Sequence, residues 1–351
     1  MTHPYEGLPD SRFWRRAVSN VETHLLDPVT ATSFRIAPED KVATAGSCFA
    51  QHISRSLKRF GMTYFVAEDG EALPANLQER RQFGTFSARY GNIYTAAQLR
   101  QLLEEAYGDR VPSEKPWRNA IGNWLDPLRP TVEPDGFISI EALQEDRTRH
   151  LSAVRMLFET LDVLVFTLGL TEAWRSRIDS TVFPLAPGVA GGTFDPNTHE
   201  FVNFTASETE ADLLQALSIL RRVNPSSRVI LTVSPVPLIA TFENRNVIVS
   251  TAYSKAALRI SAEHASRSLP NVDYFPSYEI ITGPWATNHY FEGDLRSISP
   301  LGVAHVMRVF HRHYFDNHSP DVEPVSGQDI MSESEEAISC DEEMIESLRS
   351  R

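Results

Sequence analysis

The chain has 351 residues, 42% of them hydrophobic, and a formal net charge of −13 at pH 7. This length can hold one large α/β domain with insertions or two small domains. Ten acidic residues against two arginines give the segment 321–351 a charge of −8 and leave −5 for the body. This balance argues against a surface that binds nucleic-acid phosphates.

No apolar run approaches the roughly 18–20 residues that cross a bilayer. The first residues also lack a basic start and an apolar core, so we expect no membrane span and no secretory signal. Cys48 and Cys340 are the only cysteines. We expect them to lie far apart, which argues against a disulfide framework or a structural zinc site. The sequence therefore predicts a cytoplasmic protein with no metal ion and no cofactor.

The hydrophobic pattern divides the chain into an arm packed on the body (1–38), an α/β domain (39–318) and an acidic, largely disordered tail (319–351). Within the tail, residues 341–348 have the pattern of a short docking helix. We expect strands at 41–45, 62–66, 163–168, 228–235 and 272–276, and helices at 48–60, 96–107, 140–160, 207–223, 251–268 and from Pro300 onward. Residues 67–150 fit no simple strand–helix unit and are interpreted as a helical and loop insertion after the second strand.

Five strands joined by helical crossovers predict the fold class. They favour a three-layer α/β/α sandwich around a central, mostly parallel five-stranded sheet of the flavodoxin-like type. In such a sheet the functional site lies at the carboxyl ends of the strands. Four segments reach this edge: residues 46–47, 169–174, 234–235 and the loop through Asp294.

The first strand ends at Gly46-Ser47-Cys48-Phe49-Ala50, where a helical pattern begins. A strand, a tight turn and a helix place the Ser47 hydroxyl beside helix N–H groups that have no intrahelical partner. Ser47 can therefore attack a carbonyl while N–H groups stabilise the oxyanion. The alternative is an ordinary turn with a serine N-cap. Cys48 is either a nucleophile activated by the helix N-terminus or a buried packing residue.

This pentapeptide resembles the signature of the GSCFA-domain family, a branch related to the SGNH/GDSL hydrolases. The resemblance continues through residues 89–95, 168–172, 234–235, 274–279 and the loop at Asp294. It implies a serine esterase or acyltransferase that forms an acyl-Ser47 intermediate. The implied substrate is a small-molecule or glycan ester.

The resemblance also implies roles for individual residues. Ser47 takes the place of the nucleophile, and Gly91, followed by Asn92, is the candidate for an oxyanion-binding glycine. Gly84 is the alternative to Gly91. Thr171 stands where an asparagine donor is expected, and the next candidates for lining the pocket are Glu172 and Trp174.

The sequence departs from the superfamily pattern at the general base. Asp294 matches the first position of the Asp-x-x-His element, but Ser297 stands where the histidine is expected. His289, five residues upstream on the same loop, is our candidate base, oriented by Asp294. The alternatives are His305 and His52.

Two other hypotheses stay open because of these departures. One is a catalytically degenerate SGNH-like module that binds a glycan, a small carboxylate or a protein partner. The other is a regulatory or scaffold protein whose acidic tail binds a protein partner.

Overall fold

A computed structural model describes residues 3–316 and 340–347. The strands are β1 (Val42–Gly46), β2 (Trp117–Arg118), β3 (Trp124–Leu125), β4 (Val163–Leu168), β5 (Glu172–Ser176), β6 (Val182–Phe183), β7 (His199–Asn203), β8 (Arg228–Val233) and β9 (Val272–Tyr274). The α-helices are α1 (Ala50–Arg59), α2 (Ala75–Arg80), α3 (Ala96–Ala106), α4 (Ile140–Thr160), α5 (Ala206–Val223), α6 (Val247–Ser268), α7 (Ser277–Thr282), α8 (Pro300–Tyr314) and α10 (Glu343–Ser347). Short helical turns are η1 (Asp10–Arg12), η2 (Arg15–Ser19), η3 (Thr23–Leu25) and η4 (Pro284–Ala286).

The central sheet is parallel and has the strand order β1-β4-β8-β9. The structure describes four strands in it where the sequence predicted five, because residues 62–66 contribute only an isolated bridge between Val42 and Tyr64. Side chains of the insertion, in place of a fifth strand, form hydrogen bonds with the rest of this edge of β1. Ser87 Oγ accepts the N–H of Thr44, and the hydroxyl of Tyr90 donates to the Thr44 carbonyl.

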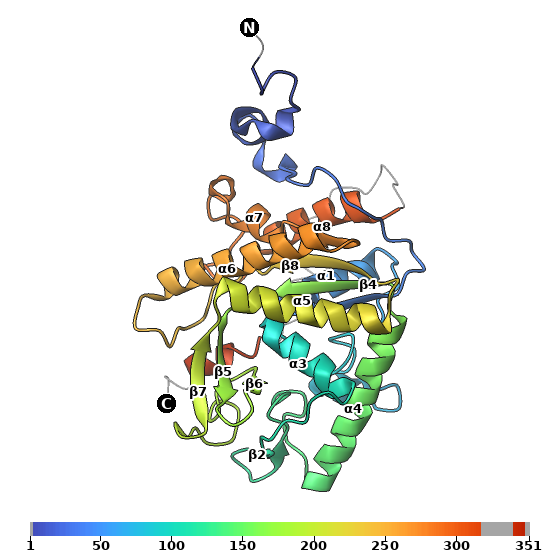
Figure 1. Cartoon of the computed structure of the whole chain (residues 1–351), viewed down its shortest axis with the longest axis vertical. Coiled ribbons are helices and arrows are strands. Elements are labelled where there is room, and N and C mark those ends of the chain that lie inside the picture. The colour runs from blue at the N-terminus through green and yellow to red at the C-terminus, as the bar shows by residue number, and fades with distance from the viewer. Residues whose placement is uncertain (1–2, 317–339, 348–351) are drawn as a thin grey trace.

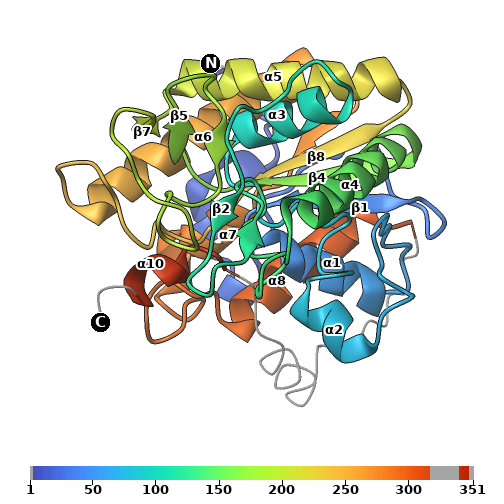
Figure 2. The same cartoon turned by 90° about the horizontal axis from the view of Figure 1, so that it is seen from below.

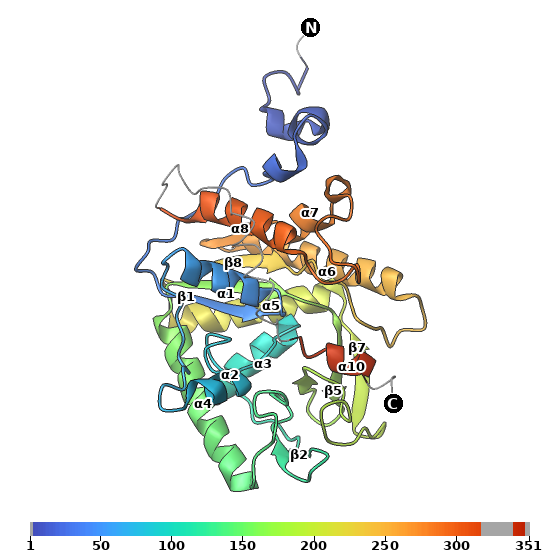
Figure 3. The same ribbon diagram turned by 180° about the vertical axis from the view of Figure 1, so that it is seen from behind.

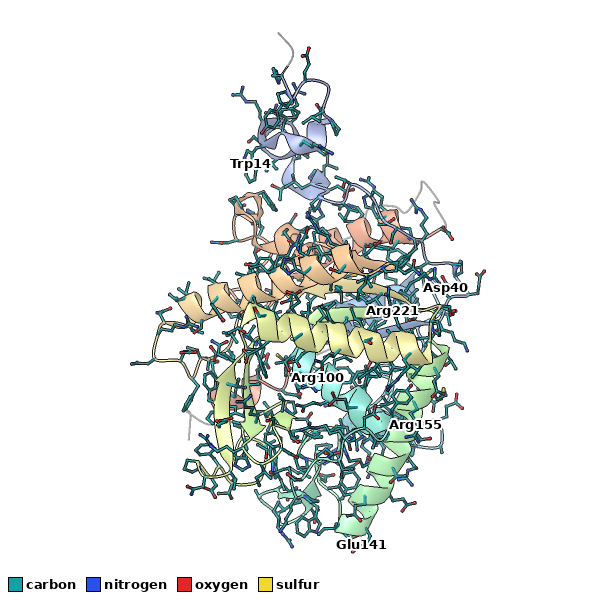
Figure 4. The ribbon with its side chains drawn as sticks, viewed as in Figure 1. Trp14, Asp40, Arg100, Glu141, Arg155 and Arg221 are labelled. Carbon is teal, nitrogen blue, oxygen red and sulfur yellow. The ribbon has the colours of Figure 1, made fainter. Side chains whose placement is uncertain are left out.

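Helices cover both faces of the sheet, which is compatible with the expected three-layer sandwich (Figures 1 and 2). Side chains alternate along the buried strands, as period-2 geometry requires. Val163 and Val165 pack toward α1, α7 and α8, whereas Leu164 and Phe166 pack toward α3, α4, α5 and α6. Arg100 on α3 pairs with Asp212 on α5 at 2.7 Å (Figure 4).

Capping side chains define where several helices begin. Thr95 and Gln98 form a capping box at α3, and Thr205 and Glu208 form another at α5. Ser299 Oγ accepts the N–H of Gly302 and caps α8, which starts at Pro300 as the sequence predicted. These local signals explain why the starts of α3, α5 and α8 could be predicted from the sequence.

The chain after β4 forms a three-stranded antiparallel sheet of order β6-β5-β7. No strand was expected between residues 168 and 207, because glycines and prolines interrupt the alternation of apolar residues there. A smaller antiparallel pair, β2-β3, lies in the insertion. The β6-β5-β7 sheet stands at the end of the central sheet where β4 ends (Figure 1).

The first residues of the N-terminal arm project from the body (Figure 1), whereas later parts of the arm and the C-terminal helix contact it. In the arm, Ile36 bridges to Phe315, and the ring of Trp14 lies 6.0 Å from that of Trp285 (Figure 4). The helix α10 lies beside the β6-β5-β7 sheet (Figure 3). Tail residues 317–339 and 348–351 lie outside the described residues, so the prediction of disorder there is not addressed. No helix in the described ranges is long and apolar enough to cross a membrane.

Candidate active site

Ser47 lies at the carboxyl end of β1, directly before the turn into α1. Gly46 has φ +131°, and a Cβ at this position would overlap the carbonyl of Thr167, so only glycine fits. The N–H of Ser47 donates to the Thr167 carbonyl at 3.0 Å and so continues the pairing of β1 with β4. The Ser47 side chain is 3% exposed, and its hydroxyl has no hydrogen-bond partner among the described residues.

The segment that follows Arg89 forms the wall beside Ser47. The N–H of Ile93 donates to the Gly46 carbonyl at 2.8 Å, which brings Asn92 to the end of β1. Gly91 has φ +69° and makes the turn just before it. The carbonyl of Tyr94 accepts the N–H of Gly169, and a Cβ on Gly169 would lie 3.1 Å from the Ser47 Cβ. Ser47, Asn92 and Gly169 thus share one corner.

Lys255 on α6 reaches the same corner from a third element. Its side chain is 1% exposed, and its Nζ donates to the Gly169 carbonyl at 2.7 Å. Burial lowers the pKa of Lys255 to about 8, although nearby Glu342 and Cys48 act in the opposite direction. The sequence reasoning did not single out Lys255. The sequence feature that could have indicated its burial is that Lys255 lies three residues before Leu258, on the apolar face of a helix.

Asp294 organises the loop that precedes α8. Its carboxylate accepts hydrogen bonds from the Ser297 hydroxyl at 2.6 Å and from the N–H groups of Arg296 and Ser297 at 2.9 Å. Partial burial works against its ionised form, but these hydrogen bonds outweigh it and lower the pKa of Asp294. Ser297 thus takes the place expected for a histidine, and the turn holds Arg296. His289 is exposed and is not among the partners of the Asp294 carboxylate.

The alternative histidines are engaged elsewhere. His305 accepts from the Tyr290 hydroxyl at Nδ1 (2.6 Å) and donates from Nε2 to the Leu26 carbonyl (2.7 Å). Burial lowers the pKa of His305 to about 4, in keeping with a neutral ring that joins the arm to α8. The ring of His52 packs on Phe49 at 5.4 Å, and burial lowers its pKa to about 4 as well.

Thr171 faces away from the corner. Its hydroxyl donates to Asn203 Oδ1 at 2.7 Å and its N–H donates to Ser254 Oγ at 2.9 Å. Because both donors are used, Thr171 joins β5 to β7 and to α6 in this structure. The expected role of Thr171 as an oxyanion donor finds no support in these contacts.

Glu172 and Trp174 line an apolar cavity of about 250 Å³ between the β6-β5-β7 sheet and the loop before α6. The Glu172 carboxylate accepts from the Thr241 hydroxyl at 2.7 Å and the Phe242 N–H at 3.2 Å. Glu172 thereby holds the loop that forms one wall. The Trp174 ring packs edge-on against Phe242, with ring centres 4.8 Å apart. The cavity is suited to an apolar group.

The C-terminal segment, defined here as residues 340–347, lies across this corner. Cys340 Sγ is 3.4 Å from Cys48 Sγ, so the expectation that the two cysteines lie far apart was wrong. Sequence separation alone gave no information on this contact, which the fold creates by returning the chain end to β1. Cys48 is buried and Cys340 partly so, and both are free thiols.

Two carboxylates of this segment are buried in the site. Asn92 Nδ2 donates to Asp341 Oδ2 at 3.0 Å, and Arg296 Nη2 donates to Glu342 Oε2 at 2.7 Å. Asp341 is 5% exposed and Glu342 is 7% exposed. Burial raises the pKa of both carboxyl groups, against the pull of Asn92 on one and of Arg296 and Lys255 on the other. The sequence predicted a short docking helix at residues 341–348, and the structure has α10 there, but the sequence did not place it at this site.

The fold and the site define an α/β protein with a buried serine, a lysine and an arginine at the carboxyl edge of a parallel sheet. A sequence model of the GSCFA family matches residues 41–310, more than half of the chain, and the chain belongs to this family. The match contains Ser47, Asn92, Lys255 and Arg296 and ends before the C-terminal segment. No curated protein gives a significant match to the chain.

Proposed function

We propose that the chain is a serine esterase or acyltransferase that acts on an acyl ester, of a carbohydrate or another small alcohol, through an acyl-Ser47 intermediate. The observation that carries the proposal is the Ser47 hydroxyl. It is buried at a strand–helix corner without a hydrogen-bond partner in the described ranges, beside an Asn92 amide that holds a carboxylate oxygen. A buried polar atom without a partner calls for an explanation, and a catalytic role is one such explanation. The resemblance to SGNH hydrolases supports the same chemistry.

We assign the general base to Lys255, because His289 is exposed and does not bind Asp294. A base is most effective when its pKa lies near the working pH, and burial brings the pKa of Lys255 to about 8. Serine–lysine pairs are an established variant of the serine triad. Lys255 Nζ lies on the Gly169 carbonyl, and Gly169 packs against Ser47.

In the proposed reaction, Ser47 Oγ attacks the ester carbonyl carbon and its proton passes to Lys255 Nζ. The amide of Asn92 donates to the oxyanion, in the place where it now binds Asp341. Lys255 then returns the proton to the leaving alcohol, and the ester C–O bond breaks. Water or a second alcohol resolves the acyl-enzyme, and the cavity beside Trp174 accommodates the acyl group.

Labelling with an uncharged fluorophosphonate tests this proposal, because such probes phosphonylate activated serines. The adduct should map to Ser47 by peptide mass and disappear in Ser47→Ala. Ser54→Ala is a matched control, since Ser54 is also a buried serine near this corner but its hydroxyl donates to the Gln51 carbonyl. Absence of an adduct from folded protein, with the C-terminal segment both docked and displaced, would reject the enzyme function.

A second candidate function is a degenerate module that binds a small carboxylate. It is favoured by the absence, in residues 3–316 and 340–347, of any hydrogen bond between Ser47 and a histidine, and by the carboxylates already in the site. Under this alternative, Ser47→Ala would leave carboxylate binding unchanged and no turnover would be detected.

A further inference from the structure

Asn92, Lys255 and Arg296 form what we call the donor cluster. They come from the segment beside β1, from α6 and from the loop before α8, yet all three border the C-terminal segment. Asn92 and Lys255 are buried, and Arg296 is half-buried. Three donors, two of them cationic, are thus gathered at the corner that contains Ser47.

Within the described residues, the ion pairs of Arg296 are made only with the C-terminal segment, at 2.7 Å to Glu342 and at 3.8 Å to Glu343. Lys255 has a backbone carbonyl as its hydrogen-bond partner, and Glu342 is the carboxylate that acts on it. Buried cations without a nearby anion are costly. The body of the protein therefore presents a site that requires an anionic occupant.

The two carboxylates of the C-terminal segment occupy different positions. Asp341 sits on the Asn92 amide, where the proposed reaction develops its oxyanion, so its carboxylate stands in for the reacting ester oxygen. Glu342 accepts a hydrogen bond from Arg296 and lies beside Lys255, so its carboxylate marks where a negatively charged group of the substrate would bind. Glu342 and Ile345 also line the apolar cavity beside Trp174.

From this arrangement we infer that the donor cluster binds a carboxylate group carried by the acyl-ester substrate, and that Asp341 and Glu342 occupy this subsite as an internal competitor. That the substrate is an ester rests on the proposed function, whereas the binding of a carboxylate by the donor cluster does not. With the C-terminal segment docked at this corner, Ser47 is 3% exposed. Substrate therefore reaches Ser47 only when the C-terminal segment leaves the donor cluster.

The test uses the full chain with Asp341→Asn and Glu342→Gln combined, which removes both charges and keeps the side-chain shapes. Glu346→Gln is the matched control, because Glu346 is an exposed acid of the same C-terminal segment, on α10. Two quantities are measured: binding of glutarate by calorimetry, and the rate at which the uncharged fluorophosphonate labels Ser47. Charge-assisted hydrogen bonds are roughly twice as strong as neutral ones, so the double variant should label at least about tenfold faster than wild type.

The double variant should also bind glutarate at least about tenfold more tightly than wild type, and Arg296→Met in the same background should abolish that binding. A synthetic peptide of residues 340–347 should slow labelling of the double variant again, and the same peptide with Asn and Gln at positions 341 and 342 should not. This peptide experiment separates displacement of the segment from a defect in folding.

The outcomes distinguish the inference from the proposed function. Glutarate binding without labelling of any protein supports the donor cluster and rejects the serine enzyme. Equal labelling of wild type and the double variant, with no glutarate binding to either, overturns the inference and leaves the enzyme in place.

Discussion

Lys255 should set the pH dependence of Ser47 acylation. Only the neutral amine can accept the serine proton, and burial places the pKa of Lys255 at about 8. The neutral fraction then rises from about 1% at pH 6 to about 90% at pH 9. We therefore predict that the labelling rate of wild-type protein increases about 100-fold across this range and levels off above it.

The assay is the second-order rate of fluorophosphonate labelling at Ser47, followed by intact mass between pH 6 and 9.5. Lys255→Met should lower the rate by about 10²–10⁴-fold and remove the pH step. His289→Ala, which changes an exposed side chain, should leave the profile unchanged. A midpoint near the usual histidine pKa of about 6.5, lost in His289→Ala, would refute the assignment of the base to Lys255.

The lowered pKa of Lys255 also predicts how the free energy of unfolding depends on pH, which tests that pKa independently of labelling. In the folded chain Lys255 loses its proton near pH 8, whereas in the unfolded chain it keeps the proton up to the ordinary lysine pKa of 10.5. Between these values the unfolded state binds more protons, so the free energy of unfolding rises with pH. The difference of about 2.5 pKa units corresponds to about 3 kcal/mol. Wild type should gain this much relative to Lys255→Met between pH 7 and 10.5, and a constant difference would contradict the lowered pKa.

Three further predictions follow from individual contacts. Glutathione disulfide should oxidise Cys48 and Cys340 to a disulfide, since their sulfur atoms are 3.4 Å apart. Tryptic mapping should find the linked peptides, and labelling of Ser47 should slow. Mixed disulfides with glutathione alone would contradict the docked position of the C-terminal segment. Gly46→Ala should lower the free energy of unfolding by about 3 kcal/mol or more in urea titration, while Gly61→Ala, which has open space around it, should cost clearly less. Thr171→Val should lower the free energy of unfolding by about 1–3 kcal/mol, because the Thr171 hydroxyl binds Asn203. The labelling rate of the folded variant should equal that of wild type. A rate about 100-fold slower would instead support Thr171 as an oxyanion donor.

The sequence predicted the parallel core and the Ser47 corner because both depend on local patterns. Unbroken apolar runs mark β4 and β8, and small residues after an apolar run mark the turn at Gly46. The resemblance to the GSCFA family is confirmed by the match over residues 41–310. The relation to SGNH hydrolases, and with it the roles of Gly91, Thr171 and His289, stays a prediction.

The parts that were missed depend on contacts between distant residues. The edge of β1 beside Thr44 is taken by Ser87 and Tyr90, whose side-chain hydrogen bonds leave no periodic signal in the sequence. Arg296 was not predicted, because an arginine in a loop has no local pattern that distinguishes a buried ion pair from a surface charge. The sequence predicted a short docking helix at residues 341–348, where the structure has α10. Its docking position was not predicted, because its composition does not reveal that its carboxylates bind Asn92 and Arg296.

The most direct test of the central claim is a peptide mass map of the protein after incubation with the uncharged fluorophosphonate. It should be run on wild type and on the double variant of Asp341 and Glu342, with Ser47→Ala as the blank. We predict a single adduct on Ser47, formed faster in the double variant. A folded double variant that carries no adduct, or one that carries it on another residue, would contradict the assignment of Ser47 as the nucleophile.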